Sequence, residues 1–161
     1  MKLRLGWGIT GNTAIDPYKT QGNLEYGRYS YGSNGVLAFY QKEMPNPNLS
    51  WEKTEQWNAG IDFGFLGNSL TGTFDIFQRD TKDMLGPGVD FPDFFGADAP
   101  KTNNARMRNR GWELALNYRG QINGDIQYTI GGSISDATSE VTEYANPTGT
   151  NPNDNWYTGK K

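Results

Sequence analysis

The sequence predicts an all-β fold of antiparallel up-and-down strands, and three observations support it. Apolar and polar residues alternate with a period of two in several separate segments, as they do in strands whose two faces meet different surroundings. Glycine supplies 21 of 161 residues and aromatic residues 14%, whereas hydrophobic residues reach only 35%. This composition is typical of β-chains with long polar connections. No run approaches the ~20 apolar residues of a membrane-spanning helix.

The first predicted strand covers residues 2–9. Its apolar positions are Leu3, Leu5, Trp7 and Ile9. The alternate positions are Lys2, Arg4, Gly6 and Gly8. One face of this strand therefore suits an apolar environment and the other a polar one.

A β-hairpin is predicted over residues 56–76. In the first arm the apolar positions are Trp57, Ala59, Ile61, Phe63 and Phe65. Polar residues or glycine occupy every position between them. The turn Gly67-Asn68-Ser69 leads into a second alternating arm that carries Leu70, Phe74 and Ile76. Two alternating runs joined by a short Gly/Asn turn are the usual signal of a hairpin.

A second hairpin is predicted over residues 112–134. Its apolar positions are Trp112, Leu114, Leu116 and Tyr118, then Ile126, Tyr128, Ile130 and Ile134. The turn lies at Asn123-Gly124-Asp125. Together with the preceding segments this gives five strands of about ten residues, a length that crosses a bilayer at a tilt.

The connections differ greatly in length. Two are tight turns, whereas residues 11–47 and 80–108 form long stretches rich in Gly, Asn, Pro and Tyr. Val36–Tyr40 is a candidate sixth, short strand within the first stretch. Short turns at one end and long loops at the other are typical of outer-membrane barrels.

Periodicity alone also fits a soluble β-sandwich that packs one face of each sheet on a core. The aromatic residues near strand ends favour the barrel, because barrels carry aromatic girdles at both membrane interfaces. These residues are Trp51, Trp112, Tyr118 and Tyr128.

The composition also excludes several kinds of chemistry. The chain has no cysteine and no histidine, so it lacks thiolate ligands, disulfides and the commonest general base. A net charge of −3 argues against a nucleic-acid partner. The glycines of Gly6-Trp7-Gly8-Ile9-Thr10-Gly11 match a dinucleotide-binding pattern, but no helical segment follows them. We therefore expect no catalytic residue, no metal and no cofactor.

Several blocks of the sequence resemble the SusC/RagA family of TonB-dependent outer-membrane transporters. The longest is Pro45-Asn46-Pro47-Asn48-Leu49-Ser50-Trp51-Glu52-Lys53-Thr54-Glu55-Gln56. Further blocks are Asn58–Phe65, Leu70–Thr73, Gln78–Asp83, Asn109–Leu114 and Gly8–Asn12. They occur in the family's order, cover most of the chain and coincide with the strands and turns above. The resemblance favours the barrel, so the predicted fold is a partial segment of a large transmembrane β-barrel.

The resemblance implies a parent protein with about 22 strands and a plugged lumen. It also implies a plug domain and a TonB-contacting N-terminal region, neither of which is present in residues 1–161. A SusD-like surface lipoprotein would be the partner, outer-membrane lipid the surroundings, and oligosaccharides or peptides the cargo. We expect this chain to be a fragment of five or six barrel strands, inactive in transport by itself.

Positions in this barrel follow from the alternation. Lipid-facing residues are expected to be Trp57, Ile61, Phe63, Phe74, Leu114 and Leu116. Lumen-facing residues are expected to be Asp62, Asp75, Glu113 and Arg119, either touching substrate or lining the wall and the plug. Candidate substrate contacts are the loop aromatics Tyr18, Tyr26, Tyr29, Tyr31, Phe94 and Phe95, which could instead pack loops together or dock the lipoprotein.

Two other functions stay open at this point. One is a soluble β-sandwich that binds carbohydrate on its loop tyrosines. The other is a purely structural barrel segment. Solubility without detergent would separate the first from a barrel fragment, because a lipid-facing surface requires detergent.

Overall fold

A computed structural model describes all residues except 14, 16–17, 33, 87–90 and 146–155. Five strands form one antiparallel sheet in the order β1-β4-β5-β6-β7, and two further strands form a separate hairpin. The sheet strands are β1 (Lys2–Asn12), β4 (Glu52–Phe65), β5 (Leu70–Leu85), β6 (Asn103–Ile122) and β7 (Ile126–Tyr144). The hairpin pairs β2 (Leu24–Tyr31) with β3 (Asn34–Gln41), and a short 3₁₀ helix, η1, covers Asp93–Phe95.

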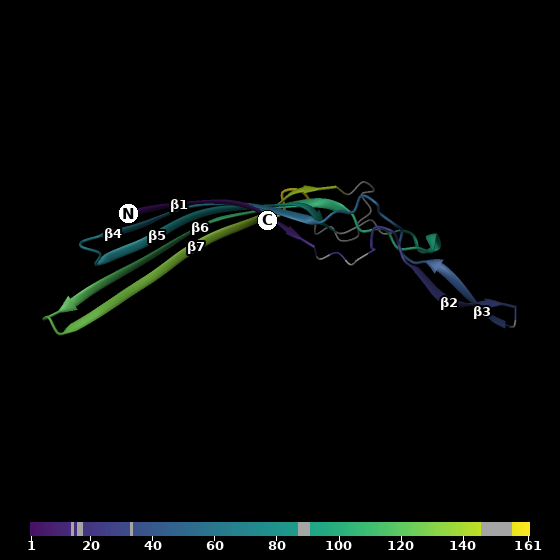
Figure 1. Cartoon of the computed structure of the whole chain (residues 1–161), viewed down its shortest axis with the longest axis horizontal. Coiled ribbons are helices and arrows are strands. Elements are labelled where there is room, and N and C mark those ends of the chain that lie inside the picture. The colour runs from purple at the N-terminus through teal and green to yellow at the C-terminus, as the bar shows by residue number, and fades with distance from the viewer. Residues whose placement is uncertain (14, 16–17, 33, 87–90, 146–155) are drawn as a thin grey trace.

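The two predicted tight turns are confirmed. Three residues, Asn123–Asp125, join β6 to β7. Asn123 (φ 49°) and Gly124 (φ 81°) are both left-handed, and the Asp125 N–H donates to the Ile122 carbonyl at 3.3 Å. The β4–β5 turn is left-handed at Leu66, Gly67 and Asn68, and the Ser69 N–H donates to the Leu66 carbonyl at 3.2 Å. Both turns lie at the same end of the sheet, and the β6–β7 turn extends farther (Figure 1).

The strands are longer than predicted. We expected about ten residues each, whereas β4 has 14, β5 has 16, β6 has 20 and β7 has 19. The added length lies mostly at the end away from the tight turns. There the backbone ladder continues while polar residues occupy positions on both faces, so the alternation that marks a strand in the sequence is lost.

The first long connection contains more regular structure than predicted. The short strand expected at Val36–Tyr40 is confirmed within β3, and β2 pairs with it along its whole length. Tyr26, Tyr29 and Tyr31 therefore belong to a strand and not to an irregular loop. The hairpin projects at the end of the molecule opposite the tight turns (Figure 1).

In the part of the chain that the structure describes, the sheet is a single curved layer with no second layer against it (Figure 1). Within the described residues the only buried hydrophobic side chains are Ala105 and Val141. A β-sandwich needs an apolar core between two sheets, so this architecture is not formed here. No helix in the described part of the chain is long and apolar enough to cross a membrane.

Candidate functional site

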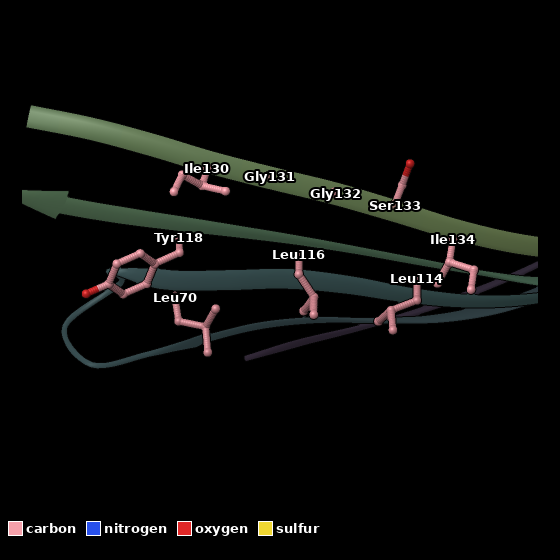
Figure 2. Close-up of a pocket in the computed structure, with 9 residues that line it drawn as sticks. All are labelled: Leu70, Leu114, Leu116, Tyr118, Ile130, Gly131, Gly132, Ser133 and Ile134. Atoms are coloured by element: carbon pink, nitrogen blue, oxygen red, sulfur yellow. The ribbon is translucent and has the colours of Figure 1, made fainter.

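One face of the five-stranded sheet is apolar. The register places Ile61, Phe74 and Leu114 directly opposite one another on three neighbouring strands. Figure 2 shows leucine and isoleucine side chains on one side of the sheet and Ser133 pointing to the other. All six residues expected to face lipid lie on this apolar face: Trp57, Ile61, Phe63, Phe74, Leu114 and Leu116. That this face contacts lipid stays a prediction.

The apolar face is uncovered. Leu5 is 87% exposed, Ile130 66% and Ile134 59%. A soluble monomer rarely exposes so large a contiguous apolar surface. This face therefore requires an apolar partner, either protein or lipid.

The upper limit of the apolar residues shifts from strand to strand. We call the end away from the tight turns the upper end. The last apolar residue on this face is Ile9 on β1, Trp57 on β4, Ile76 on β5, Trp112 on β6 and Ile134 on β7. Ile9 is level with Glu55, whereas Ile134 is level with Ile61 through Leu114 and Phe74.

The apolar residues of this face form a band across the five strands, and the shift gives the slope of the band's upper edge. The shift amounts to about six residues, or roughly 20 Å along the strands, over about 19 Å across four strand spacings. A line joining the last apolar residues therefore crosses the strands at about 45°. Barrel strands tilt by about 35–45° from the membrane normal, so the boundary has the slope of a membrane surface.

A charged belt lies above the apolar band on the same face. It consists of Lys53, Glu55, Asp80, Lys82, Arg108, Arg110, Asp136 and Glu140. Lys82 pairs with Glu55 at 2.6 Å and Arg108 with Asp80 at 2.6 Å. The indole N–H of Trp7 also donates to Glu55 at 3.2 Å, which joins the aromatic edge of the band to the belt.

These contacts favour the ionised carboxylates. Hydrogen bonds from Lys82 and Trp7 lower the pKa of Glu55. Burial by itself would raise the pKa of Asp80, but hydrogen bonds from Arg108 and Gln78 bring it below its ordinary value. These hydrogen bonds therefore hold the carboxylates of Glu55 and Asp80 in their charged form.

The opposite face of the sheet is polar and holds an ion cluster. Arg4 Nη2 lies 2.8 Å from Asp62 Oδ1 and 2.8 Å from Asp75 Oδ2. The contact with Asp75 crosses Gly60, which lies between them in the register. A Cβ at Gly60 would overlap Asp75 Oδ1, so glycine provides the space in which the two charges meet.

The four residues expected to face the lumen share this polar face. The structure brings Asp62 and Asp75 together through Arg4. Glu113 is directly opposite Asp75 in the register, and Arg119 lies lower on β6. Neither Glu113 nor Arg119 forms an ion pair within the described residues. Arg4 was missed as a site residue, because its partners lie 58 and 71 residues away and only the register unites them.

The loop aromatics do not form one platform. Tyr26 lies opposite Phe39 on one face of the β2–β3 hairpin, whereas Tyr29 and Tyr31 are on the other. Phe94 is exposed in η1, and the ring of Phe95 packs against that of Phe91 at a centroid distance of 4.7 Å and an interplanar angle of 50°. Tyr18 is exposed in a turn with φ 68°. That any of these six touches substrate stays a prediction.

No group of three or more His, Cys, Asp or Glu side chains in the described ranges could hold a metal ion. The described part of the chain has an apolar face and a polar face on its sheet, and a projecting β2–β3 hairpin. Such an arrangement is suited to a wall between two different solvents.

Comparisons of the sequence with a family model and with known proteins identify the same family. Residues 3–161 match the model of the TonB dependent receptor-like, beta-barrel family. The TonB-dependent receptor SusC of Bacteroides thetaiotaomicron is 36% identical over 153 residues, which cover 89% of this chain. The TonB-dependent receptor P3 of Formosa agariphila is 29% identical over 83% of the chain.

Solved structures agree with this match. The RagAB peptide importer in its open-open state superposes with a TM-score of 0.77 over 98% of this chain, at 29% identity. The closed-closed state gives 0.75. This chain spans 15% of the length of SusC, 13% of receptor P3 and 17% of the matched chain in the open-open importer.

Proposed function

Because the chain belongs to the TonB-dependent receptor-like β-barrel family, we propose that it forms part of the wall of a barrel that imports a nutrient. Members of this family are outer-membrane β-barrel proteins, and this chain is part of one. The proposed cargo is an oligosaccharide or a peptide. Uptake of such a cargo consists of binding, plug movement and release, so the proposal includes no covalent step.

The apolar band is the observation that carries the proposal. It is uncovered, lies on a one-layer sheet and has a boundary inclined by about 45° to the strands. The band is about nine residues long on β4, from Trp57 to Phe65, which matches the 9–11 residues of a tilted membrane strand. The ion cluster of Arg4, Asp62 and Asp75 then faces the lumen, where water or the plug solvates it.

We propose that residues 1–161 supply five wall strands and that the plug and the TonB-contacting region belong to other parts of the protein. A five-stranded sheet leaves β1 and β7 as edges, and edges do not persist in hydrocarbon. The rest of the barrel is therefore the first partner of this chain.

A SusD-like lipoprotein is the second proposed partner, and the β2–β3 hairpin is its proposed contact. An isolated two-stranded hairpin is marginally stable in water. Here both faces carry exposed apolar side chains, including Tyr26 and Phe39 on one and Tyr29 and Tyr31 on the other. Aromatic surfaces of this kind are enriched in protein interfaces.

Uptake by cells tests the function. A strain lacking the gene would be complemented with the full-length protein or with a version lacking residues 70–134. Fluorescent oligosaccharides and peptides too large for porins serve as probes, with and without TonB. We expect TonB-dependent uptake of one probe class with the full-length protein alone. Uptake that is equal in all strains would refute an import function.

A further inference from the structure

Two open cavities follow one another along β6 and β7 on the apolar face. The lower cavity, about 490 Å³, lies within the apolar band. Figure 2 shows its lining, where Gly132 leaves a gap between Ile130 and Ile134. The upper cavity, about 320 Å³, has Trp57, Ile76 and Trp112 in its apolar lining and Gln78, Arg110, Asp136 and Thr138 in its polar lining. Leu114 and Trp112 are successive residues on this face, so the two cavities adjoin.

Arg110 and Asp136 are the charged residues of the upper cavity. Each is the first residue above the apolar band on its own strand, so the tilt brings both to the same height at the membrane boundary. The other basic residues of the belt, Lys53, Lys82 and Arg108, each form an ion pair. Within the described residues, neither Arg110 nor Asp136 forms one.

We infer that the two cavities bind a membrane lipid whose head group carries both a phosphate and an ammonium group, as phosphoethanolamine does. The phosphate lies against the guanidinium of Arg110, and the ammonium lies against the carboxylate of Asp136. One acyl chain occupies the groove at Gly132. This inference rests on the proposed function, because it requires the apolar band to face lipid.

Three physical arguments support this occupant. A guanidinium binds phosphate with two parallel hydrogen bonds, and basic residues at a bilayer surface attract lipid phosphates. Asp136 would repel a purely anionic head group and attract a zwitterionic one. The rings of Trp57 and Trp112 lie beside the charges, where interfacial aromatics contact the head-group region.

Lipid binding to the purified full-length protein tests the inference. The protein in detergent is mixed with phosphatidylethanolamine, phosphatidylglycerol or diacylglycerol of identical chains, and bound lipid is counted by native mass spectrometry. We expect phosphatidylethanolamine to be retained about fivefold better than phosphatidylglycerol, and diacylglycerol least of all. Arg110→Gln should lower phosphatidylethanolamine binding about fivefold, the effect of one basic residue near a lipid phosphate.

Two more variants examine the other parts of the site. Asp136→Asn should abolish the preference for phosphatidylethanolamine over phosphatidylglycerol. Gly132→Leu should lower the retention of every lipid, because its side chain fills the groove. A Cβ at Gly132 meets nothing within 4 Å, so the new side chain starts from open space and extends into the groove.

Arg79→Gln is the matched control. Arg79 neighbours Gln78 on β5 at nearly the same height, but its side chain belongs to the polar face. The inference is overturned if Arg110→Gln retains as much lipid as Arg79→Gln, or if the unaltered protein holds both phospholipids equally. In parallel, heat-shifted gel mobility reports whether each variant assembles in the outer membrane. Normal assembly without selective lipid binding would refute the lipid site and leave the barrel function standing.

Discussion

Glycines on the apolar face differ in the space that a side chain would meet. A Cβ at Gly72 would lie 2.5 Å from the ring of Phe63 and 2.7 Å from Leu116. Gly132 on the same face is open. Phe63 of β4 and Leu116 of β6 therefore fill the space above Gly72. They can approach each other across β5 because Gly72 has no side chain.

We expect Gly72→Ala to destabilise the barrel by about 1–3 kcal/mol, since the new methyl group overpacks a filled site. Gly132→Ala is the control and should change stability little. Urea unfolding of the full-length protein in lipid vesicles, followed by tryptophan fluorescence, measures both. Equal stability of the two variants would show that Phe63 and Leu116 move aside freely.

Asn103 connects the segment before β4 to the upper end of β5 and β6. Its Nδ2 donates to the carbonyls of Ser50 at 2.7 Å and Asp83 at 2.5 Å, and its Oδ1 accepts from the Ser50 N–H at 2.8 Å. A side chain with three backbone partners determines how the connection enters the sheet.

Asn103→Ala should cost about 1–3 kcal/mol, because partly buried backbone groups lose their partners. We expect faster proteolysis within residues 42–51 while the barrel remains assembled. Asn117→Ala on the same strand serves as the control, since the Asn117 side chain makes no hydrogen bond among the described residues. Unchanged cleavage in Asn103→Ala would remove this anchoring role.

At the scale of the element, the inclined boundary assigns a different membrane depth to each residue of a strand. On β7 the apolar residues run from Ile126 to Ile134, so Ile130 lies near the middle of the membrane and Ile134 at its edge. Ile134 and Ile61 lie in the same row of directly paired residues. If the boundary ran parallel to such rows, Ile134 would lie as deep in the membrane as Ile61.

Arginine substitutions along β7 measure this depth. Ile130→Arg should cost about 2–4 kcal/mol and Ile134→Arg about 0–1 kcal/mol, because the cost of a lipid-facing charge falls toward the interface. Ser133→Arg, on the polar face, should be tolerated. Unfolding in lipid vesicles gives the three values, and a larger cost at Ile134 than at Ile130 would contradict the inclined band.

At the scale of the whole molecule, the chain is an open sheet with an uncovered apolar face and two edge strands, β1 and β7. Folding in water would leave that face exposed, and folding in lipid would leave the edges unpaired. In the complete barrel, neighbouring strands pair with the β1 and β7 edges, and lipid covers the apolar face.

The 161-residue chain purified alone should therefore require detergent and should support no import when reconstituted. Light scattering on dilution below the critical micelle concentration measures the first property. Replacing Leu5, Ile61, Leu114 and Ile130 with serine should reduce this aggregation, since all four lie on the apolar face. A chain that stays monomeric without detergent would favour the soluble alternative.

The sequence by itself determined the fold class, the strand-and-turn order of residues 2–9, 56–76 and 112–134, and the two faces of the sheet. These properties follow from a period of two and from turn residues such as Asn123-Gly124, which act over a few neighbouring residues. The family blocks at residues 45–56 and 109–114 added the barrel context. Local patterns were sufficient because the alternation of apolar and polar residues within one strand reveals the different surroundings of its two faces.

Only the tertiary structure decided which distant residues meet. The Arg4 cluster, the charged belt and the slope of the apolar band all depend on the register between strands, which is set by pairing and not by any single segment. The upper parts of the strands and the β2–β3 pairing were also seen only in the tertiary structure. Backbone hydrogen bonds extend a strand whether or not its side chains alternate, so the alternation ends before the strand does.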